Sequence, residues 1–573
     1  MKKSKIMALL LSVTMVVSLL AGCGGKEESS TNANDTNAVT QDSTDGELRS
    51  ISFSYGGYAT VAADACPRLE KYLAEKLGIK MDIWVNSDGS TEMNNMLASG
   101  EYADILIWNS TENIKTAADG GNLVDLMQYK DKLPAIFEND LYAGALERIK
   151  DDYGNGEALY GLPIRVGVQE SVYAYSPSLR FDVYQNIGAP EITDWDSFLD
   201  VLEKMQKAYP ETEEGMKAYA LSMAGTDLST IWYNVVEPRG VHDTSKTVLV
   251  SQDMKTVQSI FDEGSALIEG LQFLFDANQR GLMDPDGMTQ TSADYQAKVS
   301  NGQIMYVPFD WWGAINYNTP ERTNADTPIG YAQVWPECFV IPASADNVCG
   351  NIRVLAITTA CKDIDAALEY VNWLYSDEGA EMYFNDVEGY LYTVDENGNK
   401  VPTEAYFTNA ANEDGSSHGD LTTILGGDPV ITSDTINPKT GTYYAIEKME
   451  AFQDTSNDSK LIQEWIEWNG GYRSTYDKYK DTDQLVRLSN GFNLLDPMPD
   501  DIVQIDSTLY KMLCEVSVKM VYAKDQAEFD ALWAQFKEEA YQIGYERILE
   551  ACQTRYDNAR AKDEKYSGFF SEN

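Results

Sequence analysis

Three short runs of residues decide the fold of this chain: ISFSY at 51–55, IKMDIWV at 79–85 and ADILIW at 103–108. The first two alternate apolar and polar residues, as half-buried β-strands do, whereas the third is almost wholly apolar, as a strand covered on both faces is. A helical pattern separates each pair of runs, and we expect the first helix to be capped by Asp64 and ended by Gly78. This strand–helix–strand–helix–strand order predicts a parallel sheet of the α/β class.

The carboxyl ends of these strands are the expected ligand-binding edge, because ligands bind there in open α/β sheets. Trp108 ends the third strand, and Asn109 begins the loop that follows. A flat aromatic ring stacks on the apolar face of a sugar, and planar polar groups bond its hydroxyls in pairs. Trp108 and Asn109 are therefore candidates for a sugar site, and an ordinary place in the core is the alternative for Trp108.

A second group of aromatic residues follows another expected strand. QIMYVPF at 303–309 predicts a strand, and Asp310, Trp311 and Trp312 come directly after it. A carboxylate beside two tryptophans suits sugar binding for the same reasons, with core packing as the alternative for the two rings. Trp335, in the strand-like segment 329–342, is a further candidate for ligand binding.

Paired carboxylates beside tryptophans also keep a glycoside hydrolase open, because such an enzyme needs two carboxyl groups and little else. The candidates are Asp310 and Glu467, which lies between Trp465 and Trp468. Spacing of three residues places these two tryptophans on one helix face, so that packing within the core is the commoner interpretation. With 91 acidic residues in the chain, an acid next to a tryptophan is also expected by chance.

Composition excludes several classes of function. The 573 residues include 44 Lys and Arg against 91 Asp and Glu, a formal net charge of −47 that argues against a nucleic-acid partner. Two histidines exclude a histidine-rich metal site, and no phosphate-binding, dinucleotide-binding or zinc-protease motif is present. Residues 395–399 begin like a calcium loop, but Lys400 stands where that turn needs glycine. We predict neither a cofactor nor a metal.

The beginning of the chain predicts export and lipid anchoring. Lysines precede an apolar run at 6–20, which is too short to span a bilayer comfortably and resembles an export signal. The junction LAGC at 20–23 resembles the bacterial lipoprotein box, in which Cys23 is acylated and becomes the new N-terminus. Residues 1–22 are then the signal peptide and 23–46 a polar tether, which places the protein on the outer face of the cell membrane. Whether any of the other six cysteines form disulfides stays open.

The chain resembles a known family over nearly its whole mature length. Beside the lipoprotein box and ADILIW, three long segments carry the resemblance: YSPSLRFDVYQNIGAPEITDWDSFLDVLEKMQ at 175–206, NGQIMYVPFDWWGAI at 301–315 and DIDAALEYVNWLYSDEGAEMYFNDVEGYLYTVDENGNKVP at 363–402. They are similar to the solute-binding lipoproteins of bacterial ABC sugar importers, within the LplA-like branch of the maltose-binding-protein-like cluster. The far longer C-terminal part departs from a simple maltose binder.

The resemblance implies a two-lobed periplasmic-binding-protein-like fold of type II, in which hinge-connected α/β lobes close on a ligand in the cleft. The implied first lobe is 48–165 with 329–376, and the second is 166–328 with 377–573. By the same likeness Tyr58 lies in a loop that often touches ligand, Trp108 and Asn109 match the ligand-facing end of the third strand, and Trp311 and Trp312 match a sugar-stacking strand end.

The implied function is that of a monomeric, non-enzymatic subunit that binds a carbohydrate, expected to be an oligosaccharide, and delivers it to the membrane subunits of an ABC permease. A lipid-anchored glycoside hydrolase and a receptor for a non-sugar such as a peptide or polyamine are the alternatives. The negative charge disfavours anionic glycans, although one local arginine such as Arg165 reverses this at short range.

Overall fold

The computed structural model divides the chain into two units, residues 1–47 and Leu48–Asn573. The description covers residues 48–55, 66–84, 95–108, 110–172, 177–225, 227–242, 245–408, 411–412, 415–425, 428–453 and 458–568. The expected signal peptide, tether and Cys23 lie outside these residues. No helix in the described ranges is long and apolar enough to cross a membrane.

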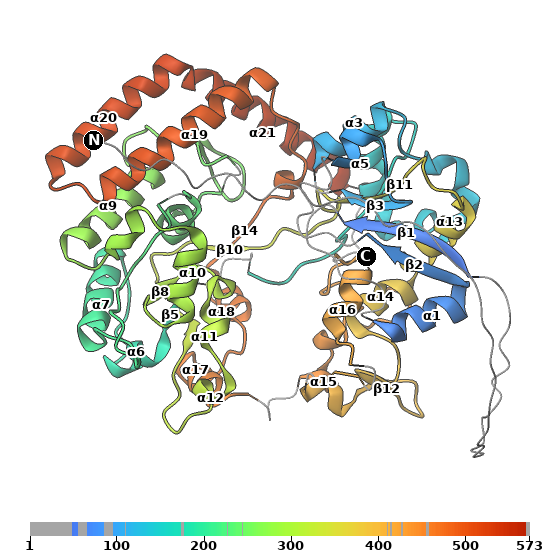
Figure 1. Cartoon of the computed structure of the whole chain (residues 1–573), viewed down its shortest axis with the longest axis horizontal. Helices are drawn as coiled ribbons and strands as arrows, with labels where there is room; N and C mark the ends of the chain where they lie inside the picture. The colour runs from blue at the N-terminus through green and yellow to red at the C-terminus, as the bar shows by residue number, and fades with distance from the viewer. Residues whose placement is uncertain are drawn as a thin grey trace, which may run out of the picture. The chain divides into compact units, whose positions relative to one another are not determined.

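The N-terminal sheet confirms the expected parallel arrangement (Figure 1). Strand β1 (Arg49–Tyr55) lies between β2 (Ile79–Ile83) and β3 (Ile105–Trp108) and pairs with both in parallel. Next to β3 comes β11 (Val354–Ile357), from much later in the chain, which runs antiparallel to β3 and to β4 (Leu162–Pro163). The five-stranded order is therefore β2-β1-β3-β11-β4, a mixed sheet with one returning strand.

Helix α1 (Pro67–Leu77) begins later than expected but ends where expected. Gly78 adopts a left-handed conformation with φ 64°, and its N–H donates to the carbonyl of Ala74. The start lies at Pro67, whose fixed φ suits a first helical residue, and Cys66 at the N-cap makes no side-chain capping bond. Asp64 was the expected cap because a carboxylate is favoured at the N-cap. This residue lies outside the described ranges.

The first core packs helices on both sides of this sheet. Besides α1 they are α3 (Thr111–Asp119), α4 (Pro134–Phe137), α5 (Ala143–Gly154), α13 (Ile364–Leu374), α14 (Asp377–Asn385) and α16 (His418–Ile424). Residues 395–399 join β12 (Tyr392–Val394) to β13 (Lys400–Pro402), an antiparallel hairpin next to α15 (Glu404–Thr408).

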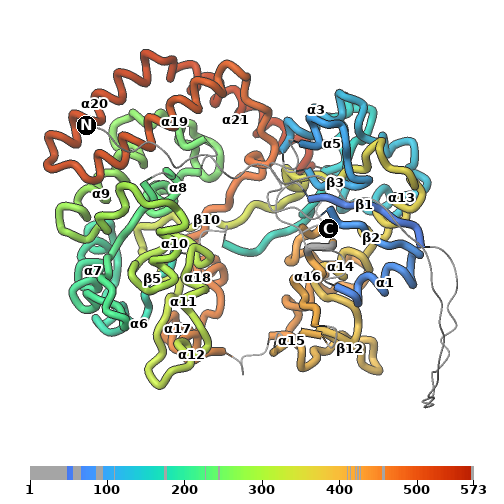
Figure 2. Tube along the Cα trace, viewed as in Figure 1, coloured from blue at the N-terminus to red at the C-terminus, as the bar shows by residue number. Residues whose placement is uncertain are grey.

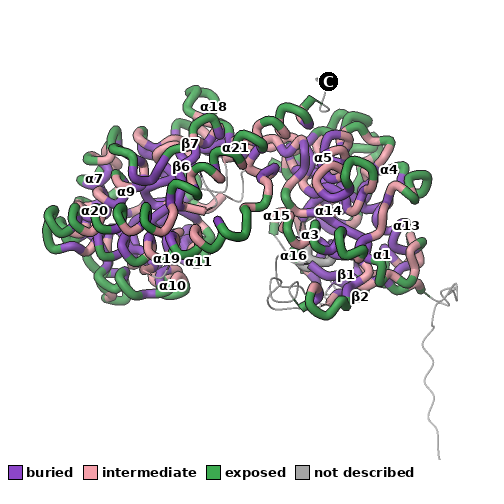
Figure 3. The backbone as a smooth tube through the Cα atoms, turned by 90° about the horizontal axis from the view of Figure 1, so that it is seen from above, coloured by how far each residue is buried: buried purple, intermediate pink, exposed green. Residues whose placement is uncertain are grey.

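The second core contains most of the remaining helices, and Figure 3 shows buried residues inside each of the two groups of elements. Its small sheet has the order β8-β5-β9, formed by Tyr306–Val307, Ser178–Arg180 and Tyr331–Gln333. Helix α7 (Trp195–Ala208) starts with a capping box between Asp194 and Ser197. The other elements are α6 (Phe181–Asn186), α8 (Ser229–Ile231), β6 (Val248–Val250), β7 (Val257–Ser259), α9 (Ala266–Gln279), α10 (Ser292–Ser300), α11 (Ala314–Tyr317), α12 (Pro320–Thr323), α17 (Lys460–Trp468), α18 (Thr475–Asp481), α19 (Asp500–Val521), α20 (Gln526–Ile543) and α21 (Tyr545–Ser567).

The packing divides the chain between the cores differently from the boundaries that the resemblance implies. Ala380, Leu421, Val430 and Tyr444 are buried in the first core, so that much of 377–453 belongs with the first lobe. Residues 331–341 instead contribute to the second lobe, because β9 pairs with β5 there. We therefore use "first lobe" and "second lobe" for the elements around the first and second cores.

The chain crosses between the cores between Val166 and Leu179, between Cys349 and Val354, and between Tyr444 and Leu461. Backbone bonds join the crossing segments to one another: Gly167 exchanges N–H···O bonds of 3.2 and 2.9 Å with Asn347. Strand β10 (Ile341–Ala343) pairs in parallel with β14 (Leu485–Arg487) beside them (Figure 2). We call these paired segments the hinge.

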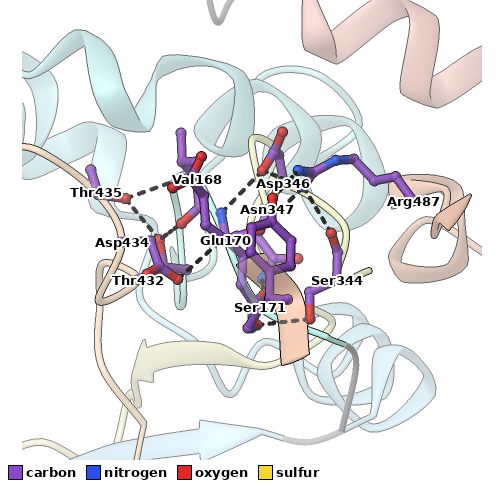
Figure 4. Close-up of polar contacts among 12 residues, drawn as sticks. Val168, Glu170, Ser171, Ser344, Asp346, Asn347, Thr432, Asp434, Thr435 and Arg487 are labelled. Atoms are coloured by element: carbon purple, nitrogen blue, oxygen red, sulfur yellow. Dashed lines mark hydrogen bonds and ion pairs between the residues drawn. The ribbon is translucent and has the colours of Figure 1, made fainter. Parts of the chain in front are cut away.

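Side chains reinforce the hinge, as Figure 4 shows. The N–H of Val168 donates to Thr435 Oγ1 at 3.1 Å, and that of Glu170 donates to Asp434 Oδ2 at 3.0 Å. Gly167 has φ 130°, and a Cβ there would lie 1.9 Å from Thr435 Oγ1, so only glycine lets these segments approach so closely.

The last helix connects the two lobes. Ile548, Cys552 and Tyr556 of α21 are buried in the second core. Near its C-terminal end, Lys562 Nζ lies 2.9 Å from Asp152 Oδ1 of α5, and Tyr566 donates to Asp151 Oδ2 at 2.7 Å. Among the described cysteines, Cys338, Cys349, Cys361 and Cys514 form no disulfide.

Candidate functional site

A pocket of about 440 Å³ lies where the second lobe meets the hinge. Most of the lining comes from the strands β5 and β9, the helices α17 and α18, and Asp310, three residues after β8. Residues 170–172 of the hinge complete one side. Lys448 contributes from the segment that follows the first core. The lining residues are Glu170, Ser171, Val172, Ser178, Asp310, Ile315, Asn318, Tyr331, Ala332, Gln333, Lys448, Ile462, Trp465, Arg473, Ser474, Thr475 and Tyr476.

Hydrogen bonds fix the polar side of this pocket. Ser178 Oγ donates to Asp310 Oδ1 at 2.5 Å, and Gln333 Nε2 donates to Asp310 Oδ2 at 3.3 Å. Thr475 Oγ1 donates to Gln333 Oε1 at 3.0 Å, which sets the orientation of the amide. A chain of hydroxyl, carboxylate and amide groups is thus held in place before any ligand arrives, and such groups suit a hydroxyl-rich ligand.

Aromatic and aliphatic side chains form the apolar side. The ring of Trp465 is largely buried, with 7% of the residue exposed, and its Nε1–H donates to the Gln333 carbonyl at 2.8 Å. Tyr476 is likewise almost buried and accepts a hydrogen bond from Arg487 Nη2 at 3.2 Å. Since both rings are anchored through their polar atoms, their faces keep a fixed orientation.

The formal charges that line the pocket are balanced. Glu170 and Asp310 carry negative charge, while Lys448 and Arg473 carry positive charge. Lys448 Nζ lies 2.7 Å from Asp434 Oδ1, and Arg473 Nη2 lies 2.6 Å from Asp458 Oδ2. Burial lowers the pKa of Lys448, but the bond to Asp434 outweighs this and raises it above its ordinary value, so that the lysine stays charged. This lining favours neither strong cations nor strong anions.

The three residues predicted after the 303–309 run have different surroundings. Asp310 lines the pocket. Trp311, next to it, is 51% exposed and stacks on Phe309 with ring centroids 4.5 Å apart, so that its other face is open to a ligand. Trp312 is half-buried against Tyr295 and Phe309, in the core beneath.

The remaining sequence candidates are scattered. Trp335 is buried and lines a separate cavity of about 250 Å³, where it packs edge-on against Tyr479. Trp108 is fully buried in the first core beside Tyr102, so its ring faces no ligand in this conformation. Tyr58 and Asn109 lie outside the described residues.

Arg165 lies at the carboxyl edge of the first-lobe sheet, just after β4. Its Nε donates to Asp428 Oδ1 at 2.6 Å. Asp428 is buried, and it also accepts hydrogen bonds from Arg353 Nη1 at 2.7 Å and from Tyr55 Oη at 2.5 Å. We call these four residues the Asp428 cluster.

Four residues of the pocket were not predicted from the sequence as site residues: Trp465, Gln333, Thr475 and Arg473. The spacing of Trp465 and Trp468 correctly predicts that both face the core, and Trp468 packs edge-on against Phe181 and Tyr184. Trp465 serves both purposes, because a helix face that covers a core also borders the pocket at its rim. Gln333 is unremarkable in the sequence and comes close to Asp310 only through the β5 strand that lies between β8 and β9.

Two α/β lobes linked by several crossing segments, with a pocket beside the hinge, define the class of two-lobed periplasmic solute-binding proteins of type II. The family model "Bacterial extracellular solute-binding protein" matches residues 58–381, and the chain belongs to this family. No curated protein sequence matches the chain.

Solved structures with the same fold are distant in sequence. An HMO-binding, ABC-transporter-associated solute-binding protein from Bifidobacterium longum infantis has a TM-score of 0.59 and 14% identity, covering 89% of this chain and 99% of that one. The Streptococcus pneumoniae substrate-binding protein FusA in complex with kestose has a TM-score of 0.58 and 15% identity, covering 90% and 100%. The N-glycan transport protein NgtS of the same species has a TM-score of 0.53 and 14% identity, covering 89% and 99%.

Proposed function

We propose that the protein is the substrate-binding subunit of an ABC importer and captures a carbohydrate, in oligomeric form, outside the cytoplasmic membrane. The observation that carries this is the pocket beside the hinge, in which anchored rings of Trp465 and Tyr476 face the fixed Asp310–Gln333–Thr475 chain. Rings for stacking and planar groups for paired hydrogen bonds match the two surfaces of a sugar. The FusA structure in complex with kestose and the N-glycan transport protein NgtS support the same substrate class.

Lobe closure is the proposed mechanism of delivery. Asp310 and Trp465 belong to the second lobe, Glu170 to the hinge, and Lys448 to the segment that leaves the first lobe. A ligand that touches these residues and the first lobe together gains its full set of contacts only in the closed arrangement, which shifts the equilibrium toward it. The closed form is what the membrane subunits of the permease recognise, and a lipid on Cys23 keeps the protein close to them. The protein acts as a monomer and uses neither a cofactor nor a metal.

Within the pocket we assign sugar contacts to Asp310 of the predicted residues, together with Gln333, Trp465 and Arg473, and we add Trp311, which follows Asp310 in the chain. Trp311 extends the stacking surface at the mouth, because its free face is exposed. In the first lobe, Tyr58, Asn109 and Arg165 supply the opposing contacts at the carboxyl edge of the sheet.

A thermal-shift screen of Leu48–Asn573 against mono- and oligosaccharides, with peptides and polyamines as controls, tests this proposal. We expect a saturable rise in melting temperature with an oligosaccharide and recovery of that sugar intact. A response to a peptide or polyamine alone would contradict the sugar assignment. Recovery of a cleaved glycan would instead identify a hydrolase and direct attention to Glu170 and Asp310, the two carboxyl groups of the pocket.

A further inference from the structure

The Asp428 cluster lies at the edge of the first-lobe sheet where a ligand is expected. Val354 of β11 pairs with Trp108, the last residue of β3, and with Pro163, the last residue of β4. Arg353 directly precedes Val354, and Arg165 comes two residues after Pro163. Both arginines therefore lie just beyond the carboxyl ends of β3 and β4. Tyr55 ends β1 at the same edge, because it pairs with Ile107.

The cluster holds one more positive charge than negative. Two arginines share the single carboxylate of Asp428, whose side chain is fully buried. The side chain of Arg353 is 21% exposed and that of Arg165 is 37% exposed. Arg165 is thus a partly exposed cation at the ligand-binding edge of a chain whose net charge is −47.

Arg165 presents an open donor fork. The only hydrogen bond of its side chain to a described residue uses Nε, so Nη1 and Nη2 have no partner among these residues. The bond to Asp428 fixes the plane of the guanidinium, and the backbone N–H of Arg165 donates to the Pro429 carbonyl at 2.9 Å, which fixes its base. Arg165 also has φ 56°, an uncommon conformation for a residue with a side chain, which turns the chain sharply between β4 and the hinge.

A planar guanidinium fork matches a carboxylate with two parallel hydrogen bonds. The balanced pocket of the second lobe adds stacking and neutral hydrogen bonds but no excess charge. We propose, on the basis of the sugar-binding function proposed above, that the ligand is an acidic sugar and that Arg165 binds its carboxylate through Nη1 and Nη2. The first lobe then binds the carboxylate of the sugar, while the second lobe binds its ring.

The test compares each acidic sugar with its own uncharged methyl ester. Probes are oligogalacturonate, oligoalginate and sialyllactose, each as free acid and as ester, with lactose and a sulfated disaccharide added. Isothermal titration of Leu48–Asn573 should show one free acid bound about tenfold to 100-fold more tightly than its ester, as a charge-assisted hydrogen bond implies. Raising the salt concentration should narrow this difference.

Arg165→Gln should abolish the preference for the acid while leaving the affinity for the ester unchanged. Arg280→Gln is the matched control: Arg280 is also 37% exposed and has a carboxylate partner at 2.6 Å, but it caps α9 in the second lobe. Because Arg165→Gln leaves Asp428 with one arginine fewer, the pair Arg165→Gln with Asp428→Asn removes both charges and should give the same loss of preference in a folded protein.

The outcomes separate this inference from the proposed function. A neutral sugar bound equally by wild type and Arg165→Gln would overturn the acidic ligand and leave the sugar receptor standing. A preference for the acid that survives in both Arg165 variants would also overturn it, as would binding of the sulfated sugar alone. Binding of peptides or polyamines but of no sugar would overturn the proposed function itself.

Discussion

The two lobes hold their late segments in place by different chemistry. In the first lobe, buried carboxylates bind segments that are distant in the sequence: Asp386 joins α1 to residues 416–418, and Asp428 joins β1 to the ends of β4 and β11. In the second lobe, α17 and α18 reach β9 through aromatic packing and neutral hydrogen bonds around Trp465 and Gln333, although Arg180 forms a buried ion pair with Asp182 elsewhere in this lobe. The attachment of the late segments therefore depends on charge in the first lobe and on shape and neutral hydrogen bonds in the second.

The largest effect should follow the loss of Asp386. Its side chain is fully buried and forms a bidentate pair with Arg68, itself 7% exposed, with Nη2 to Oδ2 at 2.6 Å. Asp386→Asn leaves a buried guanidinium without its counter-charge, which costs about 3–5 kcal/mol. Urea unfolding should show this loss. Asp365→Asn is the control, since its pair with Lys132 is exposed and should change stability by less than about 1 kcal/mol. Equal effects of the two variants would contradict the dependence of the first lobe on its buried carboxylate.

The same carboxylate predicts an acid-sensitive first lobe. Burial raises the pKa of Asp386, but hydrogen bonds with His418 and Arg68 outweigh this and hold it below its ordinary value. A carboxylate with a depressed folded pKa contributes stability that is complete above its unfolded pKa of about 3.9 and is lost as pH falls through the folded value. Hydrogen exchange between pH 5 and 3 should therefore show α1 and residues 415–425 losing protection before β5, β8 and β9. In Asp386→Asn this part of the pH dependence should be missing.

Trp311 should matter for binding far more than for stability. Its ring is 51% exposed, so Trp311→Ala should change the free energy of unfolding by about 0.5 kcal/mol or less. Loss of one stacking face should weaken sugar binding by about 1 kcal/mol, or roughly fivefold. Trp312→Ala is the contrasting variant, because Trp312 packs against Tyr295 and Phe309 and should lose stability first. Titration calorimetry beside urea unfolding separates the two, and unchanged affinity in Trp311→Ala would remove this residue from the site.

The first lobe was the more predictable from sequence because its early strands pair with near neighbours. ISFSY, IKMDIWV and ADILIW lie within 60 residues of one another, and their alternation suffices to predict parallel pairing. Strand β11 enters the same sheet from residue 354, and no local pattern states which sheet a returning strand joins. The docking of residues 380–444 on the first core depends on contacts such as Arg68 with Asp386, more than 300 positions apart.

The pocket was only partly predictable for the same reason. The order strand, carboxylate, tryptophan identified Asp310 as a candidate, because it follows from a few adjacent residues. Gln333, which bonds Asp310, lies 23 positions from it in the sequence, and Thr475, which bonds Gln333, lies 142 positions from that residue. Neither residue type suggests a site by itself. Trp108 was predicted as a candidate ligand contact but is buried in the core. A tryptophan at the end of a buried strand can face either the ligand or the core, and the choice depends on packing that the sequence does not display.

The smallest predicted effect tests whether the lobes are energetically independent. Lys562 of α21 lies between Asp152 of the first lobe, at 2.9 Å, and Asp496 of the second, at 2.8 Å. Its side chain is 25% exposed, and Lys562→Met keeps the apolar stem that packs there, so the loss should be about 0.5–1 kcal/mol and should shrink in high salt. Because this lysine joins the lobes rather than stabilising either one, its removal should lower the cooperativity of unfolding as well as the midpoint. In calorimetry the unfolding peak should broaden or divide, whereas Lys519→Met, whose partner Glu515 lies on the same helix α19, should leave the peak as narrow as in the wild type. An unchanged single peak in Lys562→Met would mean that the hinge alone couples the two cores, and that the long C-terminal helix serves the second lobe only.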